Sequence, residues 1–272
     1  MLYLVATPIG NLGDFSPRAR QVLEGADIVA CEDTRTSRQL FSLLGIQVKK
    51  TIAYHDFNEE KAVPKIIEQL KAGVEMALVS DAGMPLISDP GYKLIRACRE
   101  QGIEVTSVPG ANAVLTALQL SGLPTDSFYF GGFLPPKTSQ REKSLLAMAD
   151  LPCTLIFYET AKRLTESLKA IEKTLGNRQV AVVRELTKKF EQVQTDDVSN
   201  LIDYYNENGV PKGEIVLVIQ GGKESQHSTQ NTVSIKQLRS FLSAKDTAQV
   251  LSLIQNISKK EAYAQVLAHD KL

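Results

Sequence analysis

Between residues 76 and 91 the chain reads Met76-Ala-Leu-Val-Ser-Asp-Ala-Gly-Met-Pro-Leu-Ile-Ser-Asp-Pro-Gly91. The apolar run at 76–79 is typical of a buried strand, and residues 92–98 have the pattern of a helix. The glycines and prolines between them predict a loop that joins this strand to this helix. Ligands of open α/β sheets bind beyond the carboxyl ends of the strands. The loop is therefore a candidate small-molecule site, and a packed loop without a ligand is the alternative.

The same alternation of apolar runs and amphipathic segments extends over the first 122 residues. It predicts strands at residues 2–6, 28–31, 50–53, 76–79 and 104–108. The helices are expected at residues 17–24, 35–44, 59–71, 92–101 and 111–120. Strands that alternate with helices indicate an α/β fold with a mainly parallel sheet covered on both faces.

The pattern breaks at two segments rich in glycine and proline, residues 122–126 and 131–136, which predict a hinge at about 122–137. A second set of strands is expected at residues 154–158, 179–183, 187–195 and 214–220, with helices at 163–175 and 198–207. The predicted domains are therefore 1–122, 123–222 and a small helical domain at 234–272, after a polar linker at 223–231. In the helical domain, Ser258 is expected to cap the final helix, and the last two helices resemble a helix-turn-helix.

The composition restricts the class of protein. Lys and Arg together equal Asp and Glu, at 31 each among 272 residues, so RNA binding would need a local basic patch. Three separated cysteines among apolar residues indicate reduced buried thiols, with no disulfide and no metal site. No signal peptide or membrane span is expected, and a cytoplasmic protein is predicted.

Two more loops are predicted at the same edge of the sheet, at residues 7–13 and 108–113. The first of them lacks the glycine spacing of a dinucleotide fingerprint or a P-loop, and the second has small residues that permit a close approach. After the second strand, Glu32 and Asp33 could accept a proton, and Arg35 and Arg38 could hold phosphate; a helix cap with an ion pair is the alternative.

Eight motifs together resemble one known family. They are Thr7-Pro-Ile-Gly-Asn-Leu-Gly13, Cys31-Glu-Asp-Thr-Arg35, the Ser80–Gly91 loop, Gly122-Leu-Pro-Thr-Asp126, Gly132-Phe-Leu-Pro135, Ile156-Phe-Tyr-Glu159, Arg184-Glu-Leu-Thr-Lys188 and Lys212-Gly-Glu214. They occur in the order seen in the bacterial ribosomal RNA small subunit methyltransferase I family of the tetrapyrrole (corrin/porphyrin) methylase superfamily. The resemblance covers residues 2–220, and the tail from 234 is similar to that family's helical domain.

The resemblance implies two α/β/α domains with S-adenosylmethionine in the cleft between them, and a homodimer. The implied reaction is 2′-O-methylation of a cytidine ribose in the decoding region of 16S ribosomal RNA, in RNA or in the small subunit. The implied cofactor contacts are Pro8, Ala82, Gly83, Met84, Ile87, Asn112, Ala113, Tyr158, Glu159, Glu185 and Leu186. Met84 stands where the family usually has threonine, and its thioether can pack against the cofactor.

No catalytic base is evident from the motifs. Asp33, Asp81 and Glu159 are candidates for a base or orienting carboxylate, and Lys188 for a cation that stabilises developing charge. The candidate RNA contacts are Arg35, Arg38, Lys137, Arg141, Arg163, Lys188 and Lys189. A tetrapyrrole C-methyltransferase and a non-catalytic cofactor- or RNA-binding module are the alternatives.

Overall fold

The structure is a computed structural model that describes residues 1–222, 235–255 and 257–269. It contains two compact units, Met1–Gly221 and Gly222–Leu272. The predicted linker at residues 223–231 lies outside the described residues. No helix among the described residues is long and apolar enough to cross a membrane.

The first half of the larger unit contains a five-stranded sheet in the order β3-β2-β4-β1-β5, in which every pair of neighbours is parallel. Its strands are β1 (Leu2–Val5), β2 (Ile28–Cys31), β3 (Thr51–Ala53), β4 (Met76–Val79) and β5 (Val105–Val108). The helices are α1 (Pro17–Gly25), α2 (Thr34–Leu44), α3 (Glu59–Lys71), α4 (Tyr92–Glu100) and α5 (Ala113–Leu120), with a short 3-10 turn η1 (Leu12–Asp14). The predicted mainly parallel sheet is confirmed.

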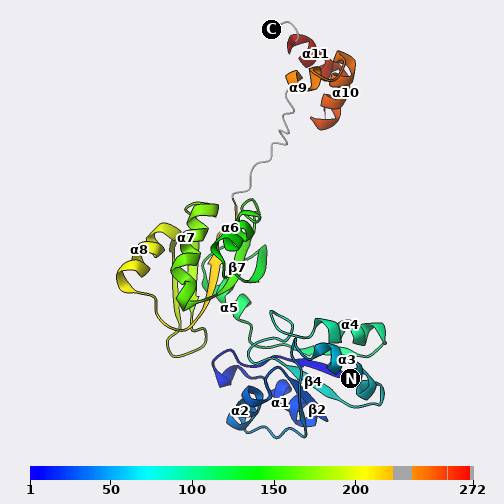
Figure 1. Cartoon of the computed structure of the whole chain (residues 1–272), viewed down its shortest axis with the longest axis vertical. Helices are drawn as coiled ribbons and strands as arrows, with labels where there is room; N and C mark the ends of the chain where they lie inside the picture. Colours follow the sequence, from blue (N-terminus) through cyan, green and yellow to red (C-terminus); the bar gives the residue numbers. More distant parts are fainter. Residues whose placement is uncertain (223–234, 256, 270–272) are drawn as a thin grey trace. The chain divides into compact units, whose positions relative to one another are not determined.

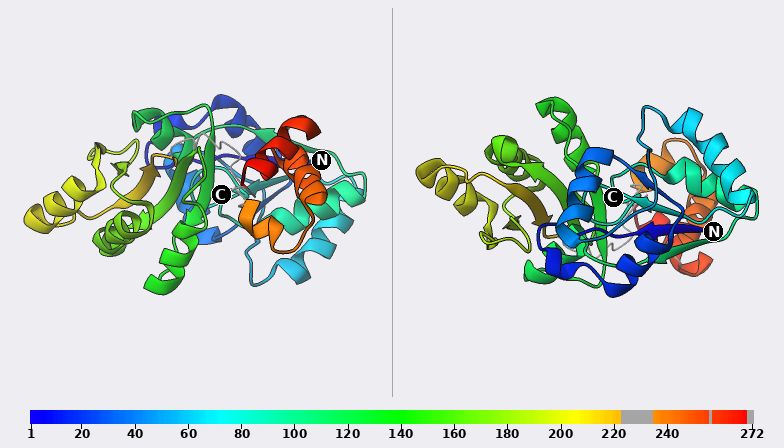
Figure 2. Two further views of the ribbon diagram at one scale, coloured as in Figure 1. Left: turned by 90° about the horizontal axis from the view of Figure 1, so that it is seen from above. Right: turned by 90° about the horizontal axis from the view of Figure 1, so that it is seen from below.

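Alternating side chains of these strands build a core on each face of the sheet. Val5 and Val29 pack with α1 and α2 on one face, while Leu2 and Met76 pack with α3 and α4 on the other (Figures 1 and 2). Successive residues of a strand point to opposite faces, so a strand buried on both sides reads as a continuous apolar run. Cys31 and Cys98 are buried in these two cores.

The second sheet has the order β6-β7-β10-β8-β9 and is mixed. Only β6 and β7 pair in parallel. Its strands are β6 (Phe128–Phe133), β7 (Thr154–Thr160), β8 (Gln179–Arg184), β9 (Gln192–Asp197) and β10 (Glu214–Ile219). The helices are α6 (Thr138–Leu146), α7 (Leu164–Leu175) and α8 (Val198–Asn208), and the 3-10 turn η2 (Ala161–Arg163) follows β7. These three helices cover one face of the sheet through Leu145, Leu168 and Leu201.

The segment of the predicted hinge, residues 122–137, contains the strand β6. The glycine pair that suggested a break instead permits a close approach to β7: a Cβ on Gly131 would lie 2.3 Å from a ring carbon of Phe157. Gly132 has a φ of +66°, and the pairing register shifts between Phe130 and Phe133. The glycines therefore form an irregularity in an edge strand.

Two further segments differ from prediction. Residues 138–146 form α6, for which no helix is predicted from sequence, and β9 begins at Gln192 rather than at residue 187. Thr187 has a φ of +63°, which excludes it from a strand. Helix α5 precedes the predicted domain boundary at 122. Its Val114 and Ala117 nevertheless pack on the face of the second sheet that α6, α7 and α8 do not cover. The division into 1–122 and 123–222 stays a prediction.

The smaller unit contains α9 (Ile235–Arg239), α10 (Ala244–Ile254) and α11 (Lys259–His269). Its core is formed by Ala248, Leu251, Ala262 and Val266. The Ser258 hydroxyl accepts a hydrogen bond from the backbone N–H of Glu261, whose carboxylate accepts one from the Ser258 N–H. This capping box confirms the predicted start of the last helix.

Candidate active site

A pocket of about 390 Å³ lies at the carboxyl edge of the first sheet. It is lined by residues of the loops that follow β1, β2, β4 and β5, and by β6, β7, β8, β10 and their adjoining loops in the second sheet. The volume is within the usual range for small-molecule sites. The two sheets therefore share one candidate active site.

The loop after β4 is held in a defined conformation. Thr7 and Gly83 form an isolated antiparallel bridge, in which each N–H donates to the other's carbonyl oxygen at 2.8 and 3.1 Å. Leu86 and Ser88 have φ values of +72° and +69°, which lie in a region that residues other than glycine rarely adopt. Such conformations persist only where the surrounding structure fixes them, so the backbone along the pocket is preorganised.

Asn112 connects this loop to α5. Its side-chain oxygen caps the helix by accepting from the N–H of Leu115 at 3.0 Å, while its amide nitrogen contacts the Met84 sulfur at 3.5 Å. The cap satisfies a helix N–H and at the same time orients the amide toward the loop. Met84 is therefore held against Asn112 on the pocket wall.

Three carboxylates line one side of the pocket: Glu32, Asp81 and Asp89. Burial raises the pKa of Asp89 to about 6, with the charges of Glu32, Asp81 and Asp56 acting in the same direction and a hydrogen bond from Ser80 opposing them. Burial and neighbouring carboxylates also raise the pKa of Glu32 and of Asp81. Negative charge collected in a partly dry site favours a cationic ligand group. No cluster of His, Cys, Asp and Glu that could hold a metal ion occurs among the described residues.

The second sheet and its loops contribute a mainly apolar wall. Val183, Leu186 and Val216 line it, together with the ring of Tyr158. Tyr158 makes edge-to-face contacts with Phe130 and Phe133, with ring centroids 5.0 and 5.4 Å apart. Burial, with the charge of Asp89, raises the pKa of Tyr158 to about 12, so the phenol is neutral at pH 7. This wall suits a flat or aliphatic ligand surface.

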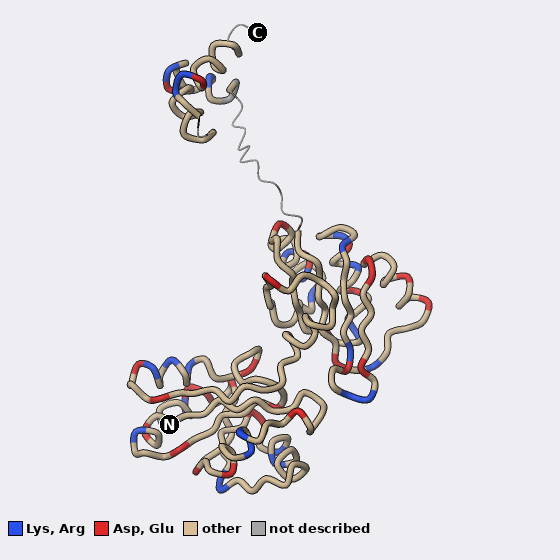
Figure 3. The backbone as a smooth tube through the Cα atoms, turned by 180° about the vertical axis from the view of Figure 1, so that it is seen from behind, with Lys and Arg blue, Asp and Glu red and all other residues tan. Residues whose placement is uncertain are grey.

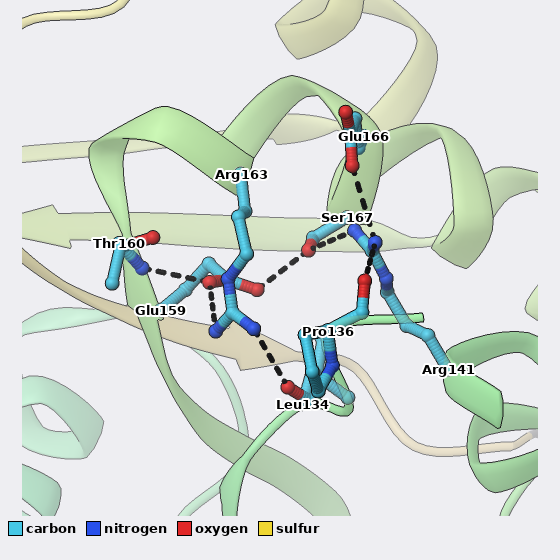
Figure 4. A network of polar contacts seen from close by, with 8 residues as sticks. All are labelled: Leu134, Pro136, Arg141, Glu159, Thr160, Arg163, Glu166 and Ser167. Carbon is cyan, nitrogen blue, oxygen red and sulfur yellow. Dashed lines mark hydrogen bonds and ion pairs between the residues drawn. The ribbon is translucent and has the colours of Figure 1, made fainter. Parts of the chain in front are cut away.

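Glu159 also lines the pocket, but its carboxylate is the centre of a buried polar network (Figure 4). Its Oε1 accepts from the N–H of Thr160 at 2.7 Å and pairs with Arg163 at 2.6 Å, and its Oε2 accepts from the Ser167 hydroxyl at 2.6 Å. Arg163 in turn donates to the carbonyl of Leu134. With both oxygens occupied, the arrangement favours a positioning role for Glu159 over proton abstraction.

Arg141 belongs to the same network and is fully buried, which contradicts its prediction as an RNA contact. It donates to the Ser167 hydroxyl at 2.9 Å, to the Pro136 carbonyl at 3.1 Å and to Glu166 at 3.2 Å. A side chain enclosed in this way cannot reach a phosphate on another molecule. Arg163 is similarly committed, with about a fifth of its side chain exposed.

The predicted catalytic and RNA-binding groups differ in availability. Arg35 is exposed but pairs with Asp33 at 2.7 Å, and its hydrogen bonds lower the pKa of Asp33 to about 2, which makes Asp33 a weak base. Arg38 is exposed and donates to the Thr51 hydroxyl, and Lys137 is exposed beside α6. Asp81 lies exposed at the pocket with a raised pKa.

Of the predicted cofactor contacts, all but Pro8 and Glu185 line the pocket. Glu185 instead pairs with Lys188 and accepts from the N–H of Glu214. Sequence reasoning missed Asp89 and the residues around the start of β10. Asp89 stands in the quoted loop and could have been recognised, and Gly213 belongs to the Lys212-Gly-Glu214 motif. Ile215 carries no local signal, because pairing with β7 and β8 brings it to the pocket.

Comparison with known proteins agrees with this geometry. The family model for Tetrapyrrole (Corrin/Porphyrin) Methylases matches residues 1–202. Among solved structures, cobalt precorrin-4 methyltransferase is similar with a TM-score of 0.57 and 18% identity, covering 80% of this chain and 93% of that one. Diphthine synthase is similar with a TM-score of 0.61 and 15% identity, covering 80% and 89%. The chain therefore belongs to the tetrapyrrole methylase family.

The sequence relatives are more specific. A protein of Pasteurella multocida named ribosomal RNA small subunit methyltransferase I is 43% identical, over 99% of this chain and 97% of its own length. Its namesake in Escherichia coli O157:H7 is 41% identical over 98% and 94%, and the one in Mesorhizobium japonicum 52% over 80% and 74%. The chain belongs to the ribosomal RNA small subunit methyltransferase I family, and the predicted resemblance is confirmed.

Proposed function

We propose that this protein transfers the methyl group of S-adenosylmethionine to the ribose 2′-hydroxyl of a cytidine in the decoding region of 16S ribosomal RNA. The observation that carries the proposal is the pocket shared by the two sheets, to which loops of the first sheet contribute three carboxylates and the second sheet contributes mainly apolar residues. Membership of the ribosomal RNA methyltransferase family supports RNA as the acceptor. A cytoplasmic location and a homodimer are further parts of the proposal.

The residues of the pocket fit this cofactor. S-adenosylmethionine carries a positive sulfonium and a positive ammonium against one carboxylate, so Glu32, Asp81 and Asp89 would favour its binding. Val183, Leu186 and the other apolar residues would contact the adenosine. When bound, the cofactor supplies an already activated methyl group, which reduces the demand on the protein to positioning of the ribose oxygen.

The proton of the ribose hydroxyl still has to leave. Asp81 is the best placed of the proposed bases, because it is exposed at the pocket and its pKa is raised, whereas Asp33 is a weak base and Glu159 is fully paired. A cation near the developing oxyanion would assist. Lys188 is the candidate for that role, although in this structure its ammonium pairs with Glu185 and Glu214, each at 2.9 Å.

The experiment is transfer of labelled methyl to small ribosomal subunits from a strain that lacks the protein, followed by nuclease mapping. We expect label on a cytidine ribose. Label on another base or ribose would contradict the assigned nucleotide. Labelling of a porphyrinogen instead of RNA would support the tetrapyrrole alternative, and cofactor binding without any transfer would support a binding module. Light scattering of the full chain tests the homodimer.

Cofactor affinity is expected to depend on pH through Asp89. Because its pKa is about 6 in the free protein and a nearby cation would lower it, lowering the pH from 7 to 5 should weaken binding by about ten-fold. The same raised pKa has the opposite effect on folding: protonation of Asp89 adds stability as the pH falls below about 6, so Asp89 itself would not contribute to unfolding over this range. Calorimetric titration at several pH values measures the effect.

The Asp89→Asn variant should bind S-adenosylmethionine more weakly at pH 7 and lose most of the pH dependence of binding. An unchanged dependence of affinity on pH would contradict this role of Asp89.

Replacing Asn112 by alanine should reduce both stability and cofactor affinity. Loss of the cap of α5 costs about 1 kcal/mol of unfolding free energy, and loss of the contact with Met84 loosens the pocket wall. Ser16→Ala is the matched control, since Ser16 caps α1 through the N–H of Ala19, away from the pocket residues. Urea denaturation should show similar losses for the two variants, and only Asn112→Ala should weaken binding of S-adenosylmethionine. Equal affinities of the two variants for S-adenosylmethionine would mean that Asn112 does not contribute to cofactor binding.

A further inference from the structure

The connection between β8 and β9, residues 185–191, has an unusual and well-defined backbone. Glu185 and Thr187 have φ values of +51° and +63° without being glycines, and Thr187 is β-branched. The loop is closed by the N–H of Thr187 donating to the Glu191 carboxylate at 2.7 Å and the N–H of Lys188 donating to the Glu185 carbonyl at 3.0 Å. A strained backbone that is held in this way presents its side chains in fixed directions.

The two adjacent lysines of this loop have different environments. Lys188 is mostly buried, pairs with Glu185 and Glu214, and packs against the loop after β1, where a Cβ on Gly10 would lie 2.5 Å from its Cγ. Lys189 has no carboxylate within ion-pair distance among the residues that the structure describes, and its ammonium lies 5.6 Å from the centre of the Phe190 ring. Phe190 is 63% exposed. The loop therefore anchors itself through Lys188 and presents Lys189 and Phe190 to solvent.

This pair lies beside the pocket. Leu186, in the same loop, is a pocket-lining residue. The antiparallel register places Thr160, Arg184 and Glu214 at the same end of three neighbouring strands in the second sheet. The exposed Lys162 and Lys212 follow and precede these strand ends, so they flank the same end of the sheet. Figure 3 shows blue and red segments together at the β8–β9 loop, where the carboxylates of Glu185 and Glu191 accept hydrogen bonds from Lys188 and Thr187. The carboxylates inside the pocket are thus bordered by lysines outside it.

An exposed aromatic ring beside an ammonium that has no carboxylate partner among the described residues suits an unpaired nucleotide. Every base can stack on a ring, and every phosphate attracts a cation. We propose that Phe190 stacks on an unpaired base of the substrate RNA and that Lys189 contacts an adjacent phosphate, which together hold the strand at the mouth of the pocket. This inference rests on the proposed function for its substrate class. It separates Lys189, which contacts RNA, from Lys188, whose ion pairs with Glu185 and Glu214 hold the loop.

The test is binding of the full-length protein to small ribosomal subunits from a strain lacking it, measured by filter retention without cofactor. Phe190→Ala should weaken binding by roughly ten-fold or more, and Phe190→Trp should retain it, since stacking needs a ring and not a particular one. Lys189→Ala should reduce the slope of log affinity against log salt concentration by about one. All three variants should bind S-adenosylmethionine as the original protein does.

Two controls match these changes. Tyr204→Ala removes another exposed ring, on α8, and Lys65→Ala removes an exposed lysine of α3; neither should alter RNA affinity. Unchanged binding by Phe190→Ala would overturn the inference, as would a loss equal to that of Tyr204→Ala. A change of oligomeric state in Phe190→Ala with unchanged RNA binding would assign the ring to a contact with a second copy, and would also overturn it. If the original protein binds small subunits but transfers no methyl group, that result would contradict the proposed reaction. The comparison of RNA binding among the variants would still test this inference.

Discussion

Gly83→Val is expected to reduce the affinity for S-adenosylmethionine by on the order of 100-fold, about 3 kcal/mol. Gly83 has a φ of +84°, and a Cβ there would lie 3.4 Å from the Ile9 side chain and 3.8 Å from the Ala111 carbonyl. A β-branched residue is strained in this conformation, and its methyl groups would press on the loop after β1 or enter the pocket. Relief of the strain would break the bridge to Thr7 that fixes the pocket wall.

Gly73→Val is the matched control for this prediction. Gly73 has a φ of +88°, nearly the same as Gly83, but nothing lies within 4 Å of its potential Cβ. Both variants should lose roughly 1–2 kcal/mol of stability from backbone strain, and only Gly83→Val should lose cofactor affinity. Calorimetric titration and urea denaturation of the two proteins measure the separate effects. Equal cofactor affinity in both would mean that the bridge is not part of the binding site.

Glu159→Ala is expected to have the largest effect on stability, about 3–5 kcal/mol of unfolding free energy. The change leaves Arg163, the Ser167 hydroxyl and the Thr160 N–H without their shared acceptor in a buried setting. Arg163 also donates to Leu134, next to the segment that follows β6, so loss of the carboxylate should loosen this connection. Arg96→Ala is the control: it breaks an exposed pair with Glu100, which should cost less than about 1 kcal/mol.

Glu159→Gln separates positioning from catalysis. Glutamine keeps the volume and one acceptor, so the variant should fold with an intermediate loss of stability, and turnover per folded molecule should fall less than ten-fold. A loss of turnover above 1,000-fold at nearly unchanged stability would instead identify Glu159 as the base. Methyl transfer to small subunits, measured beside urea denaturation of the same samples, decides between these results.

Much of the first sheet could be predicted because its signals are local. Each predicted strand agrees with the structure to within one residue. β2 and β4 are buried throughout and read as apolar runs, and glycine or proline follows β1, β4 and β5. The Ser258 cap could be predicted for the same reason, because donor and acceptor are three residues apart. The second sheet was harder to predict from sequence. The Gly131-Gly132 pair has the pattern of a break, and only its packing against Phe157 of the neighbouring strand explains why it belongs to a strand.

The site divides in the same way. Most of the residues implied by the family motifs line the pocket, but the sequence did not distinguish Lys188 from Lys189, nor Arg141 from a surface arginine. Arg141 is buried, and it donates hydrogen bonds to Ser167 and Glu166, which are 26 and 25 residues away in the sequence. Asp89 has a raised pKa because of its burial and because of carboxylates on other loops.

The sequence alone thus determined the alternation of strands and helices, the loops at the sheet edge and the family. Only the tertiary structure decided which charged groups are buried, paired or presented to a ligand. The physical reason is that strand periodicity, turns and helix caps depend on residues within a few positions of one another, whereas the burial and charge state of a side chain depend on partners that folding brings from distant parts of the chain.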